Sequence, residues 1–231
     1  MATYLIIGGS SGLGFAIASF VIRTGGKAIV VSRTKPLQSP IGHGSLTWGH
    51  CDLRSPNSVD SFLGALGECP IDYLIYCAGI WDDPAGKLSG DTQCIYDVMS
   101  VNLSGFVSLA LAVRRNLLSS RQRPLIVGIG SVSGLPNSGS LRPAYCASKA
   151  GMRGAVTALR EVLRGTSIGV SCLSLGSFSS SDDSEVKSPG DEVMRRIPLS
   201  DIMSALAFLQ SLSPRAIPKE IILPANADAG V

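Results

Sequence analysis

Tyr145 and Lys149 lie four positions apart in the segment AYCASKAG, residues 144–151. On a helix, positions i and i+4 lie on one face, so the lysine ammonium comes within reach of the tyrosine phenol. A phenol with its ordinary pKa of about 10 is a poor proton shuttle at neutral pH, and a nearby cation lowers that pKa. Lowering it to about 7 requires roughly 4 kcal/mol and a site partly shielded from water. The pair predicts acid-base chemistry, with an ordinary helix surface as the alternative.

The second chemical signal is the glycine-rich turn GGSSGLG at residues 8–14, directly after an apolar run. Glycine lets the backbone turn sharply and approach a ligand, and a helix that begins here directs free N–H groups at an anion. The turn predicts a site for the pyrophosphate of a dinucleotide, with a plain glycine-rich turn as the alternative. The expected contacts in this turn are Gly8, Ser10, Ser11, Gly12, Leu13 and Gly14.

Length and composition favour one domain over residues 1–231, long enough to bury one sizeable core. The net charge of +3 is too small and too scattered to indicate a nucleic-acid partner. No apolar run was found that reaches the roughly 18 residues of a membrane span, and no basic segment precedes the apolar residues 4–7. We therefore expect a soluble, cytoplasmic protein.

The six cysteines show no Cys-x-x-Cys spacing, and the two histidines are His43 and His50. This pattern supports neither a zinc site nor a Cys/His nucleophile, so no metal is expected. Most of the thiols fall within expected strands or helices and are interpreted as buried small side chains in a reducing compartment.

Apolar runs alternate with helical patterns along the chain, which predicts a Rossmann-like, doubly wound α/β fold. Its parallel sheet of about seven strands should have helices on both faces. The expected strands are residues 3–7, 28–32, 46–50, 73–77, 125–129, 169–175 and 220–223. The expected helices are residues 14–24, 56–66, 92–118, 143–163 and 201–212.

The glycine turn and the Tyr-x-x-x-Lys pair together resemble the short-chain dehydrogenase/reductase superfamily, and the resemblance covers nearly the whole chain. Further matches follow in the same order, at Asp52-Leu53, Ala78-Gly79, Asn102 and Ser131. The resemblance implies that Asp52, Leu53, Ala78 and Gly79 contact the dinucleotide, with Asp52 binding the adenine amino group.

The end of the second expected strand indicates which dinucleotide binds. An NAD site would have a carboxylate there for the ribose hydroxyls, whereas this chain has Ser32-Arg33-Thr34. An arginine fork and two hydroxyls suit a 2'-phosphate, so NADP(H) is favoured over NAD(H). A solvated charge is the alternative for Arg33.

The resemblance assigns catalytic roles to Ser131, Tyr145, Lys149 and Asn102. Tyr145 would give a proton to a substrate carbonyl oxygen in reduction, and Lys149 would lower its pKa and hold the nicotinamide ribose. Ser131 would hydrogen-bond the same oxygen, and Asn102 would hold a water that links Lys149 to solvent. For Asn102 alone, a helix-surface amide is the alternative.

Residues 176–198, rich in Ser, Asp and Glu, lie where the family carries its substrate lid. We expect a segment that is mobile without ligand and closes over cofactor and substrate, with Gly176 and Ser179 or Ser180 near the nicotinamide amide. So polar a lid fits a small or polar substrate. A permanently solvated loop is the alternative.

A helical wheel of residues 143–163 places Tyr145 and Lys149 on a side that can cover the sheet. The opposite side carries a stripe of small residues, Ala147, Gly151, Gly154 and Ala158. Family members commonly pair through this helix and the one at residues 92–118, so a homodimer or homotetramer is expected. A tight contact within the chain is the alternative, although no spare helix is evident for it.

Three positions depart from the family pattern, which usually has Thr, Asn and Pro where this chain has Ile7, Cys77 and Leu175. Their effect on cofactor geometry stays open. The expectation is an NADP(H)-dependent oxidoreductase that interconverts a ketone or aldehyde and an alcohol, acting on a small molecule. The alternatives are a catalytically silent NADP(H)-binding regulatory or interaction protein, which has no need of an activated phenol, and an epimerase or dehydratase of the extended branch, for which this chain is too short.

Overall fold

The computed structural model describes residues 1–82, 91–138, 140–179 and 196–226. Its seven described strands form one sheet in the order β3-β2-β1-β4-β5-β6-β7, and each neighbouring pair is parallel. The strands are β1 (Thr3–Ile7), β2 (Lys27–Ser32), β3 (Ser45–His50), β4 (Tyr73–Tyr76), β5 (Leu125–Ser131), β6 (Gly169–Leu175) and β7 (Glu220–Leu223). The predicted Rossmann-like class is confirmed.

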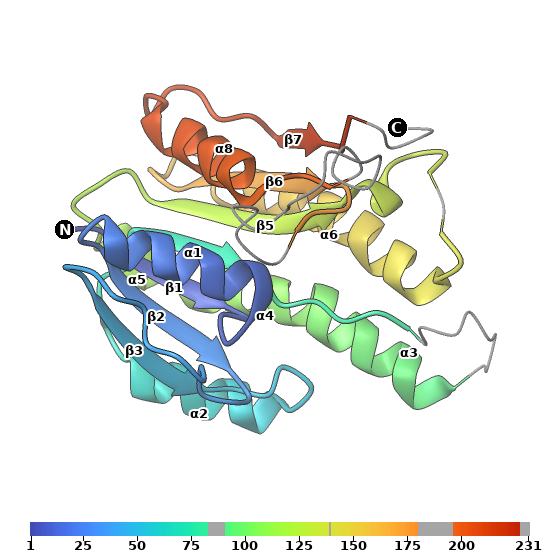
Figure 1. Ribbon diagram of the computed structural model, residues 1–231, viewed down its shortest axis with the longest axis horizontal. Helices are drawn as coiled ribbons and strands as arrows, with labels where there is room; N and C mark the ends of the chain where they lie inside the picture. The colour runs from blue at the N-terminus through green and yellow to red at the C-terminus, as the bar shows by residue number, and fades with distance from the viewer. Residues whose placement is uncertain (83–90, 139, 180–195, 227–231) are drawn as a thin grey trace, which may run out of the picture.

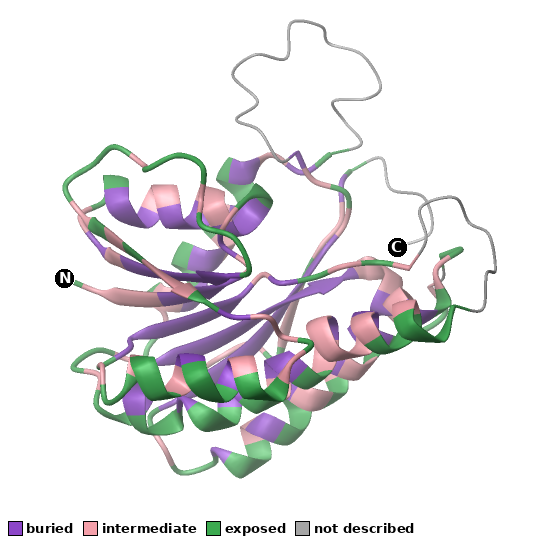
Figure 2. Cartoon of the chain, turned by 90° about the horizontal axis from the view of Figure 1, so that it is seen from below, coloured by how far each residue is buried: buried purple, intermediate pink, exposed green. Residues whose placement is uncertain are grey.

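Helices cover both faces of this sheet (Figure 1). They are α1 (Gly12–Arg23), α2 (Pro56–Leu66), α3 (Thr92–Met99), α4 (Gly105–Ala112), α5 (Arg114–Leu118), α6 (Pro143–Val162) and α8 (Leu199–Ser211), with the short turns η1 (Ser100–Ser104) and η2 (Val132–Gly134). Side chains of a strand point alternately to the two faces, so Leu5 and Ile7 join the core under α2, α4 and α6 while Ile6 joins the core under α1 and α8. Figure 2 accordingly shows the strands largely buried between two helical layers.

Local signals set the helix ends. Ser55 caps α2 by accepting a hydrogen bond from the Ser58 N–H, Pro56 occupies the first turn, and Gly67 ends the helix at φ +55°. The expected strand and helix limits agree with the structure to within two residues, apart from residues 92–118. The extension of β5 to Ser131 matters most, because it fixes that side chain at the sheet edge.

The expected single helix over residues 92–118 is wrong. It divides into α3, the π-helical turn η1, α4 and α5. The phenol of Tyr76 in β4 donates a hydrogen bond of 2.5 Å to the Val101 carbonyl, and this contact competes with the regular helical ladder. The wide turn brings Asn102 into the interior, where it is fully buried.

By length and composition alone, the described helical stretch Thr92–Ala112 is apolar and long enough to cross a membrane. The sequence analysis overlooked it because Asp97 and Asn102 interrupt its apolar positions. Core helices of water-soluble proteins pass the same test. Here α4 buries Phe106 and Leu109 against the sheet.

The sheet-facing side of α6 is as predicted, since Lys149, Met152 and Val156 are buried. The expectation that no helix was available to cover the small-residue stripe is wrong at one end. A Cβ added at Gly151 would lie 2.7 Å from Leu103 Cδ2, so η1 packs tightly on this glycine. Gly154 is exposed, and a Cβ there would meet no atom within 4 Å.

Candidate active site

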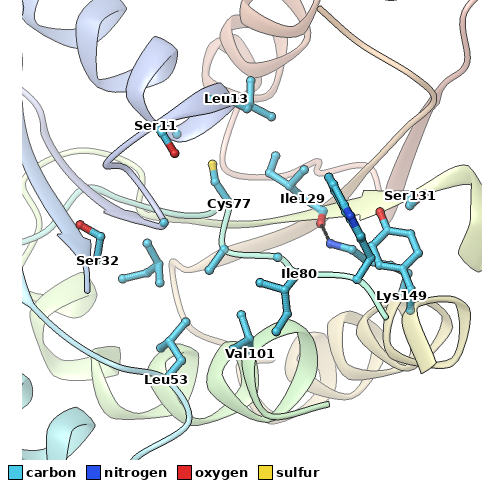
Figure 3. Close-up of a pocket in the computed structure, with 18 of the residues that line it drawn as sticks. Ser11, Leu13, Ser32, Leu53, Cys77, Ile80, Val101, Ile129, Ser131 and Lys149 are labelled. Atoms are coloured by element: carbon cyan, nitrogen blue, oxygen red, sulfur yellow. Dashed lines mark hydrogen bonds between the residues drawn. The ribbon is translucent and has the colours of Figure 1, made fainter. Parts of the chain in front are cut away.

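A cavity of about 810 Å³ opens at the carboxyl ends of β1, β2, β4, β5 and β6. Strands β2 and β3 follow one another on one side of β1, and the chain then crosses to β4 on its other side, so the order of strands reverses at β1. Open parallel sheets bind ligands at such a switch point. The sequence-predicted residues that line this cleft are Gly8, Ser10, Ser11, Gly12, Leu13, Gly14, Ser32, Arg33, Thr34, Asp52, Leu53, Ala78, Gly79, Ser131, Tyr145, Lys149 and Gly176. Asn102 lies behind its wall, and Ser180 is outside the described residues, as are residues 180–195 of the expected lid. Figure 3 shows Ser11 and Ser32 at one end of the cleft and Ser131 and Lys149 at the other.

The glycine turn has the geometry of an anion cradle. Gly8 has φ +82°, and a Cβ at Gly14 would lie 2.3 Å from the Gly8 carbonyl oxygen, so a side chain at either position would disrupt the turn. Ser11 begins α1 without a side-chain cap, which leaves first-turn N–H groups available to a ligand. The turn therefore fits the predicted pyrophosphate.

The end of β2 differs in detail from the prediction. The Ser32 hydroxyl donates to the Thr34 carbonyl at 2.7 Å and accepts from Trp48 Nε1 at 3.1 Å, so its proton is already used to shape the turn. Arg33 and Thr34 are exposed and line the cleft. Among the residues predicted here, these two keep donors for a phosphate.

Asp52 is bound by an arginine that the sequence analysis missed. Arg54 Nε and Nη2 donate to the two Asp52 carboxylate oxygens at 2.9 and 2.7 Å, and Arg54 Nη1 reaches Asp97 on α3 at 3.2 Å. The hydrogen bonds from Arg54 lower the pKa of Asp52 to about 2. Asp52 thus anchors the loop after β3 as well as facing the cleft. The sequence could have indicated this ion pair, because Arg54 lies only two positions after Asp52.

Ser131, Tyr145 and Lys149 meet at the other end of the cleft. Lys149 Nζ donates to the Ile129 carbonyl at 2.8 Å and lies 5.6 Å from the centre of the Tyr145 ring (Figure 3). Burial lowers the pKa of Lys149 from 10.5 to about 8. The Ser131 hydroxyl, buried at the end of β5, accepts from the Ser133 N–H at 3.2 Å.

The expected effect of Lys149 on Tyr145 is not what the structure has. Burial raises the pKa of the Tyr145 phenol, and a hydrogen bond with Ser131 and the charge of Arg142 act against this rise. The Lys149 ammonium donates to the Ile129 carbonyl and lies 5.6 Å from the centre of the tyrosine ring, and its charge is not among the causes that shift the pKa of the phenol. Ser131 and Arg142 are the groups that favour the phenolate in this geometry.

Asn102 holds backbone rather than facing solvent, so a surface amide is excluded. Its Nδ2 donates to the Ile80 carbonyl at 2.7 Å and to Ser148 Oγ at 2.9 Å, and its Oδ1 accepts from the Ile80 N–H at 2.8 Å. Both amide protons are therefore engaged. Asn102 fixes the segment after β4 against α6, and with it the wall of the cleft next to Lys149.

The three departures from the family pattern leave the backbone ties intact. The Cys77 N–H donates to the Ile7 carbonyl at 2.8 Å, and the Gly176 N–H donates to the Leu223 carbonyl at 2.9 Å. Leu175 is buried and pairs in register with Ser131 and Leu223. Main-chain hydrogen bonds therefore position the cleft walls at these places.

Trp81 and Asp82, which follow β4, lie beside Tyr145 at this end of the cleft, and neither residue was predicted. The Asp82 carboxylate accepts hydrogen bonds from the Ala144 and Tyr145 N–H groups at 3.0 and 3.1 Å and so caps α6. The Trp81 ring packs edge-on against Tyr145 at 6.1 Å, and the Arg142 guanidinium lies 5.4 Å from the Trp81 ring centre. The sequence signal for them was their position, since Trp81 and Asp82 closely follow a segment, Ala78-Gly79, that was already predicted to contact the dinucleotide.

The sequence matches the family described as short chain dehydrogenase over residues 2–189. The chain belongs to the short chain dehydrogenase family. The protein is therefore an oxidoreductase of this family, as the ordered motifs indicated.

A curated relative and two solved structures match most or all of this chain. The 3-oxoacyl-acyl-carrier-protein reductase FabG of Rickettsia prowazekii is 28% identical over 222 residues, covering 90% of this chain and 89% of the relative. A 4-hydroxyisoleucine dehydrogenase complexed with NADH matches with a TM-score of 0.81 and 22% identity, covering all of both chains. The closed form of serine dehydrogenase complexed with NADP+ matches with a TM-score of 0.76 and 24% identity, over 99% of this chain and 98% of that one.

Proposed function

We propose that this protein is an NADP(H)-dependent oxidoreductase that interconverts a ketone or aldehyde carbonyl and an alcohol on a small molecule. The observation that supports this most directly is that Ser131, Tyr145 and Lys149, from β5 and α6, line the same cleft as the glycine turn. A protein that only binds a dinucleotide has no need of a hydroxyl, a phenol and an ammonium gathered at one end of its cleft.

The residues present fit a dinucleotide phosphate at residues 8–14, and Arg33 and Thr34 fit a 2'-phosphate, with no carboxylate at the end of β2 to oppose it. The related structures carry NADH in one case and NADP+ in another. The preference for NADP(H) therefore rests on Arg33. When bound, the nicotinamide supplies or accepts the hydride.

This chain's own residues would manage the proton. The Ser131 hydroxyl and the Tyr145 phenol both donate to the carbonyl oxygen, which fixes its position and stabilises the negative charge that grows on it. The Tyr145 proton completes the alcohol, and the same phenolate takes the proton back in oxidation. The buried ammonium of Lys149 and the guanidinium of Arg142 supply positive charge beside this step.

The test is to assay purified protein with NADPH and NADH against a panel of ketones and aldehydes, and to repeat it with Tyr145→Phe. The variant should lose at least about 100-fold in kcat, because the proton donor is gone, while its affinity for NADPH by calorimetry stays within about twofold. Retention of more than about a tenth of the wild-type kcat would assign the acid to another group.

A further inference from the structure

The mouth of the cleft beside Tyr145 carries an excess of positive charge. Among the described residues that line the cleft, Asp52 is the one acid, and Arg54 already binds both of its oxygens. Arg142 lines the same end of the cleft as Tyr145, close enough to lower the pKa of its phenol. Arg196 also lines the cleft.

Arg142 is positioned by an aromatic ring, and its guanidinium forms no ion pair with any of the described residues. Its guanidinium lies on the Trp81 ring at 5.4 Å, and Trp81 in turn packs edge-on against the Tyr145 ring. The side chain makes no capping bond to α6 although Arg142 is the residue that precedes the helix. A guanidinium stacked in this way keeps its planar edge of N–H donors for a ligand.

Among the described residues, the Asp82 carboxylate lies at the same end of α6 as Arg142. It accepts from the Ala144 and Tyr145 N–H groups, so its negative charge is directed at the helix N-terminus. The phenol of Tyr145 has an ordinary pKa of about 10, and burial raises it further, so the phenol keeps its proton. The cation of Arg142 thus faces the substrate end of the cleft beside a neutral donor.

We propose that Arg142, supported by Trp81, binds a carboxylate on the substrate, so that the protein acts on small oxo acids and hydroxy acids rather than on uncharged carbonyl compounds. This inference rests on the proposed function, because the carboxylate is placed relative to a carbonyl at Tyr145. The arginine fork would accept the carboxylate through two parallel N–H donors while Tyr145 and Ser131 hold the carbonyl oxygen.

The experiment uses matched pairs that share a ketone and differ in charge: 2-oxobutanoate, 3-oxobutanoate and 4-oxopentanoate, each with its amide. Wild-type protein, Arg142→Gln and Arg142→Lys are assayed with NADPH. Arg142→Gln should lower kcat/KM for the preferred oxo acid by about 10- to 100-fold more than for its amide, because the loss on the amide reports only the effect of Arg142 on the Tyr145 phenol, and Arg142→Lys should fall in between. Arg215→Gln, an exposed arginine outside the cleft lining, should match wild type on both compounds.

A second readout is independent of turnover. With NADP+ present no ketone is reduced, so calorimetric titration gives the dissociation constants of the oxo acid and its amide directly. Wild type should bind the acid more tightly than the amide, and Arg142→Gln should remove the difference.

The outcomes separate the two proposals. Equal losses on acid and amide would mean that Arg142 acts only on the pKa of Tyr145, and reduction of amides with no preference for acids would overturn the carboxylate anchor while the oxidoreductase stands. No reduction of any pair with either cofactor, alongside inactivity on the wider panel of carbonyls, would overturn the proposed function and this inference with it.

Discussion

Burial shifts the pKa values of the two neighbouring side chains in opposite directions, raising that of the Tyr145 phenol and lowering that of the Lys149 ammonium to about 8. In each case the neutral form is favoured, because a charge loses hydration inside the protein. The hydrogen bond with Ser131 and the charge of Arg142 oppose this rise in the pKa of Tyr145. The sequence analysis assigned that effect to Lys149 because helical spacing places its side chain near Tyr145 but does not show that its ammonium is bound to the Ile129 carbonyl.

The first prediction concerns Lys149. The pKa of its ammonium is 10.5 in the unfolded chain and about 8 in the folded protein. Between these two pH values the unfolded chain binds more protons than the folded protein, so the free energy of unfolding rises with pH. Relative to Lys149→Met, wild type should gain about 2 kcal/mol between about pH 7 and about pH 10 without ligand. Urea denaturation at the two pH values measures it, and a constant difference between the proteins would contradict it.

The second prediction concerns Arg33. Arg33→Ala should weaken NADPH binding by about 1.5 to 3 kcal/mol and NADH binding by little, because a charge-assisted hydrogen bond to the 2'-phosphate is lost. Lys35→Ala is the control, since Lys35 is an exposed cation two residues away that does not line the cleft. Calorimetric titration of both cofactors decides, and equal wild-type affinity for NADPH and NADH would overturn the assignment.

Some residue-scale expectations could be derived from the sequence and others could not. The positions of Gly14 and Lys149 follow from local signals, because glycine turns and helical spacing are set by nearby residues, whereas Ser131 was placed by the family resemblance and lies beyond the expected end of its strand. The partner of Ser32 was missed because a polar side chain bonds whatever group the tertiary fold brings to it, and Trp48, which lies 16 residues beyond Ser32, is such a group. Arg54, the partner of Asp52, is only two residues away and could have been found from the sequence.

At the scale of elements, long-range contacts decide what local patterns leave open. The pattern over residues 92–118 predicts one helix, yet one hydrogen bond from Tyr76 accompanies a π-helical turn within this stretch. This turn buries Asn102 and sets Leu103 on Gly151. A helix predicted from periodicity alone cannot include an interruption whose cause lies on another strand.

The third prediction tests the cap that Asp82 places on α6 from 62 residues away. Asp82→Ala should lower the free energy of unfolding by about 1 kcal/mol, because two N–H groups of the first turn lose their acceptor. Asp60→Ala, an exposed acid on α2, should change it by less than about 0.5 kcal/mol. Thermal and urea unfolding measure the stability of both variants. Equal stability of the two would show that Asp82 does not stabilise the protein as a cap of α6.

At the scale of the whole molecule, alternation of strands and helices was sufficient to predict a parallel sheet with helices on both faces. The right-handed crossover rule limits how such a chain can wind, so local patterns determine much of the topology. Assembly is different. A stripe of small residues on α6 is compatible with packing by this chain or by a second copy, and Gly151 turned out to be covered from within.

The last prediction uses that contrast. Gly151→Leu should lower the free energy of unfolding by about 1 to 3 kcal/mol, because its side chain overlaps Leu103. Gly154→Leu, one turn further along α6 in open space, should leave unfolding unaffected or slightly improved, since glycine is a poor helix former. If the exposed end of the stripe is a subunit contact, Gly154→Leu should shift a homodimer or homotetramer towards smaller species in light scattering at micromolar concentration. A wild-type monomer, or an unchanged mass in Gly154→Leu, would place any contact between copies away from this face of α6.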